Sequence, residues 1–146
     1  MGLRRKSREL ALQFLFSHDF AGASDEPQAV EHELERFCAC FETGKKTLPY
    51  ARELIQGICA KRTQIDGELA DRSHNWRLER MSHVDRNILR IAVYEMKHRD
   101  DVPLKVAINE ALEIAKLYSK SDSVAFINGI LDAVQGEPGE TGPTAG

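Results

Sequence analysis

The chain has 146 residues, of which 42% are hydrophobic and 29% charged, and its formal net charge is −3. These values are typical of a globular protein that forms one domain or two small subdomains. The sequence contains no apolar run near the roughly 18 residues that a membrane span needs, and no secretory signal. The three cysteines, Cys38, Cys40 and Cys59, are an odd number for a disulfide framework. They favour a reducing cytoplasm as the location of the protein.

Charge is distributed unevenly along the chain. Residues 1–8 carry +4, from Arg4, Arg5, Lys6 and Arg8, and no acid comes before Glu9. The other 138 residues carry a net charge of −7. A compact positive spot on an acidic body suggests a local anionic ligand.

The first predicted helix begins within this cationic cluster. The residues that follow it, ELALQFLFSHDF, repeat apolar side chains with helical spacing. The cations therefore stand at a helix N-terminus, where the macrodipole disfavours positive charge by about 0.3–1 kcal/mol per group. Arginine forks suit phosphates and stack on bases, so anion or RNA binding fits this cluster. A solvated helix start that aids solubility fits it too, although such a start would prefer acids.

Six further helices are predicted in chain order. The breaks AGASDEPQA (21–29) and FETGKKT (41–47) set off a second, acidic helix near 29–41 and a third after it. A short fourth helix is predicted over 64–74. The fifth starts at Ser82, with Asp85 at capping-box spacing, and ends at HRDDVP. Two more amphipathic stretches follow, ALEIAKLY with the residues before it and SDSVAFINGILDAV.

These elements predict an all-α protein with about seven helices. We expect a single domain over 1–135, built from two small helical subdomains, 1–63 and 64–135, packed together. The last residues, GEPGETGPTAG (136–146), contain four Gly, two Pro and no large apolar side chain, so we expect a disordered tail.

Motifs for catalysis and for metal binding are absent from the sequence. There is no GxGxxG, P-loop or HExxH, and GKKT (44–47) lacks the glycine and residue order of a phosphate loop. The two thiols of CAC (38–40) would point about 200° apart on a helix, which is poor geometry for one metal. The five histidines are scattered. We predict neither an enzyme nor a cofactor or metal site.

Two residues of the last predicted helix have open interpretations. Phe126 lies off the apolar stripe of Val124, Ile127 and Leu131, and is either a core side chain or a platform on which a base stacks. Gly129 costs about 1 kcal/mol relative to alanine in mid-helix, which close packing against a neighbouring helix would explain.

Two stretches together resemble the NusB family of bacterial transcription antitermination factors. One is RRKSRELALQFLF at the start, and the other is VDRNILRIAVYEMKHRDDVPLKVAINEALEIAKLYSKSDSVAFINGILD (84–132). The family signature runs like VPxxVAINEAxELAKxF…SxxFVNGVLD, and this sequence departs from it only conservatively. Weaker similarity covers 50–80.

The resemblance implies a fold and a function. NusB proteins are all-helical, with two small subdomains, and are not enzymes. They bind the boxA element of single-stranded RNA from ribosomal operons together with NusE, a small-subunit ribosomal protein. The pair joins an RNA polymerase antitermination complex in the cytoplasm. Some members form homodimers that cover the arginine-rich surface, so a homodimer is an open alternative here.

The resemblance also assigns roles to residues. The arginine-rich RNA-binding motif of the family falls on Arg4, Arg5, Lys6 and Arg8, with Ser7 where the family often has Ala. By the same match Phe126 would stack on an unpaired base. Lys105 would contact a phosphate. Asp122 would lie at the edge of this RNA surface, or alternatively act as a helix N-cap.

Two further positions match the side of the family that faces NusE. These are Phe16, whose structural alternative is a partly buried apolar side chain, and Asp85, whose alternative is a capping-box carboxylate.

Two other functions compete with RNA-dependent antitermination. NusB-like domains occur fused in front of ribosomal RNA cytosine methyltransferase domains, so an RNA-binding accessory of a modifying enzyme is one. The chain shows no second domain or glycine-rich cofactor loop, which disfavours that interpretation. The other is a helical adaptor that binds proteins through its acidic faces and never contacts RNA.

Overall fold

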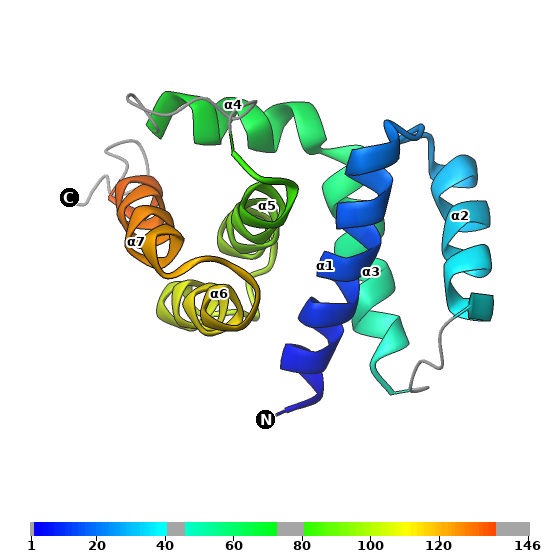
Figure 1. Ribbon diagram of the computed structural model, residues 1–146, viewed down its shortest axis with the longest axis horizontal. Helices are drawn as coiled ribbons and strands as arrows, with labels where there is room; N and C mark the ends of the chain where they lie inside the picture. Colours follow the sequence, from blue (N-terminus) through cyan, green and yellow to red (C-terminus); the bar gives the residue numbers. More distant parts are fainter. Residues whose placement is uncertain (1, 41–45, 73–80, 137–146) are drawn as a thin grey trace. The chain divides into compact units, whose positions relative to one another are not determined.

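The computed structural model describes residues 2–40, 46–72 and 81–136, and helices are the only regular secondary structure in these ranges (Figure 1). The described helices are α1 (Leu3–Ala21), α2 (Pro27–Cys40), α3 (Leu48–Ala60), α4 (Arg62–Arg72), α5 (His83–His98), α6 (Leu104–Tyr118) and α7 (Ser121–Gln135). The prediction of an all-α protein with about seven helices is confirmed. Apart from Gly136, the predicted tail over 136–146 lies outside the described residues. The chain forms two compact units, residues 1–63 and 64–146.

The first unit is built around α3. Helices α1 and α2 each pack on α3, as Figure 1 shows for the blue, cyan and teal ribbons. Apolar side chains at helical spacing make its core, because they place one stripe of each helix on its neighbours. The fully buried members are Ala11, Phe14, Val30, Leu34, Ala51, Leu54, Ile55 and Ile58. Phe14 also meets Phe37 of α2 edge to face, with ring centroids 5.5 Å apart.

Helix α1 ends in a Schellman motif at Gly22. The φ angle of Gly22 is +65°, the left-handed conformation that glycine adopts without a steric penalty. Its N–H donates to the Asp19 carbonyl, and the N–H of Ala23 donates to the His18 carbonyl. The chain therefore turns sharply at Gly22 and leads back toward α2.

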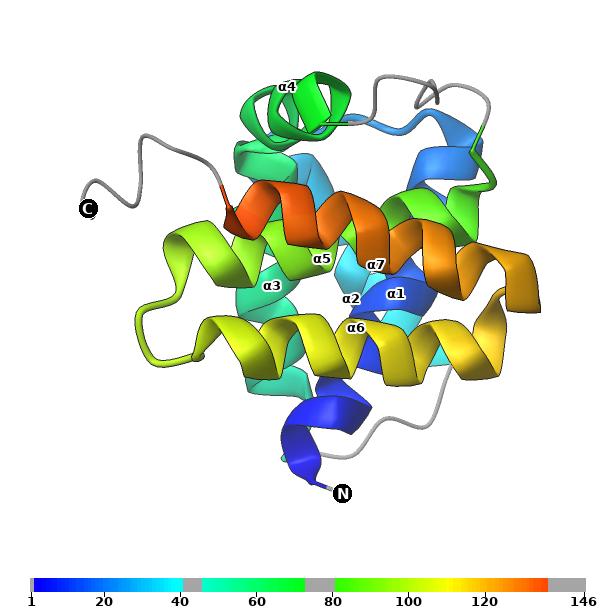
Figure 2. The same ribbon diagram turned by 90° about the vertical axis from the view of Figure 1, so that its left-hand side faces the viewer.

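The second unit is a bundle in which α5, α6 and α7 pack pairwise on one another (Figure 2). Helix α5 is buried on most sides, through Ile88, Leu89, Ile91, Ala92 and Val93. Figure 2 shows α6 and α7 running antiparallel, joined by a short connection. No described helix is both long and apolar enough to span a lipid bilayer.

A partly buried ion pair joins α4 to α5 within this unit. Arg90 is 4% exposed and donates from Nε and Nη2 to the two oxygens of Asp66, each over 2.8 Å. Its Nη1 donates to Asn87 Oδ1 over 3.1 Å. This bidentate geometry satisfies a buried guanidinium, and it fixes where α4 lies on α5.

Candidate nucleic-acid interface

The cationic start of α1 has no stabilising cap. Its N-cap residue, Gly2, has an extended backbone and offers no side chain, and the first turn contains no acid. Arg4 and Lys6 are exposed, and Arg5 is half-buried. The positive ends of these side chains therefore add to the positive end of the helix dipole. An anion near this end would meet both fields at once.

A buried aromatic ring supports the most exposed arginine of this helix start. The guanidinium carbon of Arg4 lies 4.2 Å from the centroid of the Tyr50 ring, and Tyr50, in the first turn of α3, is 8% exposed. Such cation–π contacts stabilise by about 0.5–1 kcal/mol. Ser7 Oγ lies 2.8 Å from the Thr47 carbonyl oxygen, within hydrogen-bonding distance, and so links the starts of α1 and α3. The orientation of Arg4 is therefore set by α3.

Arg8 differs from the other cations of the predicted cluster. It is 3% exposed, and its guanidinium carbon lies 5.9 Å from the Tyr50 ring centroid. The sequence predicted one exposed cluster of four cations, but the members of this cluster differ in burial in the structure. Arg8 packs inside, while Arg4 and Lys6 face solvent. Contact between Arg8 and RNA stays a prediction, and its burial gives it a structural role beside Tyr50.

The other three predicted RNA contacts lie in the second unit. Lys105 is exposed in the first turn of α6, and Asp122 is exposed in the first turn of α7. Phe126 follows Asp122 by four residues and is half-buried, so the two share one side of α7. The N-cap interpretation of Asp122 is wrong, because Lys120 occupies the N-cap position of α7, without a side-chain cap, and Asp122 is the second residue of the helix.

Lys105 and Asp122 are not brought together. Because α6 and α7 are antiparallel, the start of α6 lies at the far end from the start of α7 (Figure 2). Helix α6 has 15 residues, which corresponds to an axial length of about 22 Å. A single nucleotide cannot contact both side chains, although an extended strand can.

The packing explanation for Gly129 is also wrong. A Cβ atom built on Gly129 would meet no atom within 4 Å, and Gly129 is exposed. The described neighbours therefore do not require glycine at this position of α7.

An exposed aromatic pair lies further along α1. Phe16 is 40% exposed and Phe20 is 73% exposed, and their rings stack with centroids 6.2 Å apart. Paired exposed aromatic rings are typical of protein-binding surfaces. The sequence singled out Phe16 but missed Phe20, although the spacing of four residues signals a shared helix face.

Asp85 forms hydrogen bonds within the second unit. It is 8% exposed, and its two oxygens accept hydrogen bonds from Ser119 Oγ over 2.5 Å and Ser123 Oγ over 2.7 Å. The Asp85 N–H donates to Ser82 Oγ over 3.0 Å, which is one half of a capping box. The carboxylate joins the start of α5 to the α6–α7 corner instead of closing that box. A contact of Asp85 with a partner stays a prediction.

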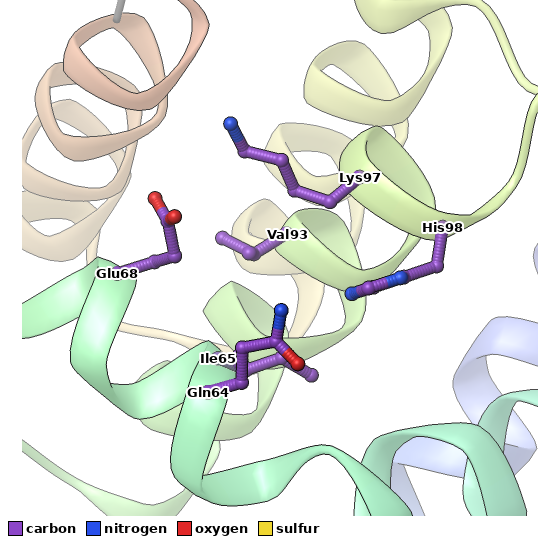
Figure 3. Close-up of a pocket in the computed structure, with 6 residues that line it drawn as sticks. All are labelled: Gln64, Ile65, Glu68, Val93, Lys97 and His98. Carbon is purple, nitrogen blue, oxygen red and sulfur yellow. The ribbon is translucent and has the colours of Figure 1, made fainter. Parts of the chain in front are cut away.

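A small pocket opens between α4 and α5 (Figure 3). Its volume is about 200 Å³, and its polar lining comes from Gln64, Glu68, Lys97 and His98. Small-molecule sites are usually about 300–1,000 Å³ and mostly apolar. We assign no ligand to this pocket.

The fold and the exposed groups define the class of protein. It is an all-helical protein of two compact units that presents a cationic helix start and an exposed aromatic pair. The NusB family model matches residues 5–136. The chain belongs to the NusB family, which confirms the resemblance found in the sequence.

Named relatives and solved structures agree with this assignment. Transcription antitermination protein NusB of Desulfosudis oleivorans is 50% identical over 95% of this chain and 89% of its own. The NusB of Desulfotalea psychrophila is 46% identical over 92% of this chain and 96% of its own. The structure of T. maritima NusB superposes with a TM-score of 0.76 at 39% identity, covering 92% of this chain and 91% of that one.

A more distant structure shares the fold. It is a chain of the complex of antitermination factors NusB and NusE with double-stranded RNA, with a TM-score of 0.72 at 21% identity. The match covers 90% of this chain and 95% of that one. None of these names describes an enzyme.

Proposed function

We propose that this protein is an RNA-binding transcription antitermination factor that acts in ribosomal RNA transcription. It binds boxA-like single-stranded RNA together with NusE, as part of an RNA polymerase antitermination complex in the cytoplasm. One observation carries the proposal most directly. In a member of the NusB family, the start of α1 presents Arg4 and Lys6 to solvent on an uncapped helix N-terminus.

The chemistry of this helix start suits a phosphate backbone. The guanidinium of Arg4 is held over Tyr50, so less conformational entropy is lost when it forms hydrogen bonds with an anion. Lys6 adds an exposed point charge two residues along. Phe126 supplies a half-buried ring that can stack on an unpaired base. Lys105 and Asp122 lie at the edges of the proposed RNA-binding surface of the second unit.

The experiment is RNA binding with a matched control. Fluorescence anisotropy of a labelled boxA-like single strand is measured with and without NusE. The site variant Arg4→Ala/Lys6→Ala is compared with Arg36→Ala/Lys61→Ala, which also removes one exposed arginine and one exposed lysine from the first unit. We expect the site variant to lose at least tenfold in affinity and the control to stay within twofold of wild type. Equal losses in both variants would contradict the proposal.

The aromatic pair of α1 is the proposed contact with NusE. Phe16 and Phe20 stack on each other and expose apolar surface that a protein partner would cover. We expect Phe16→Ser/Phe20→Ser to abolish NusE binding in calorimetry while RNA binding by the chain alone is unchanged. Leu117→Ser, which removes a 67% exposed apolar side chain of α6, is the control. NusE binding that survives the double substitution would place that interface elsewhere.

A further inference from the structure

A cluster of polar groups is buried in the first unit, at the opposite end of α1 from the cationic start. His18 is 1% exposed. Its Nδ1 lies 2.7 Å from Glu33 Oε1 of α2, and its Nε2 lies 2.7 Å from Asp25 Oδ1 in the α1–α2 connection. Carboxylates only accept hydrogen bonds, so both contacts are hydrogen bonds at once only if the imidazole carries two protons.

A cysteine completes this cluster. Cys59 of α3 is 5% exposed, and its Sγ lies 3.9 Å from His18 Nε2. One ligand atom each from His18, Asp25 and Cys59 lies within 4.8 Å of the other two. We propose that these three side chains form a binding site for one divalent transition-metal ion, with zinc as the best match to their N, O and S donors.

The spacing of the three atoms is close to that of a zinc site. Tetrahedral zinc with typical bond lengths holds N and O ligands about 3.3 Å apart and N and S ligands about 3.6 Å apart. The corresponding distances are 2.7 Å between Nε2 and the Asp25 oxygen and 3.9 Å between Nε2 and Sγ. These two distances differ from the zinc values by about 0.6 and 0.3 Å, and the Asp25 oxygen and Cys59 Sγ lie within 4.8 Å of each other. Asp25 lies in a connection and its side chain is 31% exposed, so it can move and leaves room for a water as fourth ligand.

The groups around the three ligands are those that metal sites use. A histidine that binds a metal through one nitrogen usually donates its other N–H to a carboxylate, and Glu33 occupies that position on Nδ1. The second oxygen of Asp25 accepts from Arg62 Nε over 3.0 Å, and Arg62 Nη1 donates to Asp19 Oδ1 over 3.2 Å. The His18 ring is therefore oriented before the metal arrives, and Asp25 keeps its second oxygen in a hydrogen bond with Arg62.

Metal binding would change the protonation of the cluster. A divalent ion would bind Cys59 as the thiolate, so binding would displace the proton of this thiol. Burial raises the pKa of the Cys59 thiol to about 12, so this cysteine does not suit a nucleophilic or redox role at neutral pH. Its Sγ nevertheless points at the ring nitrogen rather than only at apolar neighbours.

The test is cobalt binding to the full chain after treatment with a chelator. Co²⁺ reports thiolate coordination through a charge-transfer absorption band, and Zn²⁺ should displace it. We expect one equivalent of Co²⁺ to give this band in wild type and in Cys38→Ser/Cys40→Ser, and no band in Cys59→Ser. His32→Gln, which changes an exposed histidine, should keep the band, and His18→Gln should lose it.

Two results would overturn the proposal. Absence of a thiolate band in the folded wild-type protein would mean that these side chains form a hydrogen-bonded cluster that binds no metal. A band that survives Cys59→Ser and disappears in Cys38→Ser/Cys40→Ser would place the metal at the end of α2. If the Cys59 variant fails to fold, zinc X-ray absorption on wild type decides. One sulfur at about 2.3 Å with N or O near 2.0–2.1 Å supports the site, and a shell of N and O alone contradicts it.

Discussion

The starts of α1 and α5 are built in opposite ways. Helix α5 follows the N-cap residue Ser82, whose Oγ accepts from the Asp85 N–H, and carries an acid in its first turn. Helix α1 follows the N-cap residue Gly2, has no side-chain cap and no acid in its first turn, and carries a cluster of cations instead. The first arrangement stabilises a helix N-terminus and the second opposes it.

This difference separates a structural helix start from one that we propose binds RNA. At α5 the acid is 8% exposed and its oxygens accept hydrogen bonds from Ser119 and Ser123 within the same unit. At α1 the side chains of Arg4 and Lys6 are exposed. The residues at the start of α1 destabilise this end of the helix. Such a local cost is expected where function rather than folding selects the residues.

The largest effect on stability is expected for Asp85→Asn. The amide can accept from one serine through its oxygen, but the second hydroxyl loses its charged acceptor. We expect the free energy of unfolding in urea to fall by about 1.5–3 kcal/mol. Asp100→Asn, an exposed change in the α5–α6 connection, should leave it within about 0.5 kcal/mol. If Asp85→Asn lowered the free energy of unfolding by less than about 0.5 kcal/mol, the hydrogen bonds of Asp85 at the start of α5 would not stabilise the fold.

A smaller effect is expected from the cap itself. Ser82→Ala should cost about 1 kcal/mol, because the Asp85 N–H loses its acceptor. Gly2→Ser, which offers α1 the cap that it lacks, should add a few tenths of a kcal/mol. Both values come from urea unfolding followed by circular dichroism. If Gly2→Ser destabilised the protein as much as Ser82→Ala, the two helix starts would not differ as described.

The smallest expected effects come from charge. Lys6→Glu should raise stability by about 0.3–1 kcal/mol, because it replaces a cation by an acid near the start of α1. Lys116→Glu should lower it by a similar amount, since Lys116 is in the last turn of α6 and pairs with Glu113 over 3.0 Å. Lys6→Glu should also weaken RNA binding. Loss of stability in Lys6→Glu would contradict the view that this charge is placed for binding.

Local features of both helix starts could be predicted from the sequence. The spacing of Ser82 and Asp85 indicated the cap, and the run of cations indicated a candidate binding site, because both signals lie within a few neighbouring residues. The seven helices followed from apolar periodicity in the same way.

Features that depend on tertiary packing could not be predicted. Asp85 meets its serine partners 34 and 38 residues away, and Cys59 lies 41 residues from His18. Nothing near Arg4 signals that Tyr50 lies beneath it. The burial of Arg8 is likewise set by α1 packing on α3, so the sequence assigned four cations to the surface where the fold exposes fewer.

The most direct test of the central claim is the salt dependence of RNA affinity. The slope of log affinity against log salt changes by about 0.7 for each phosphate contact on a single strand. If Arg4 and Lys6 each contact one phosphate, Arg4→Ala/Lys6→Ala should have a slope shallower than wild type by about 1.4. Arg36→Ala/Lys61→Ala should keep the wild-type slope. Identical slopes for wild type and the Arg4/Lys6 variant would contradict the claim that the start of α1 binds the RNA backbone.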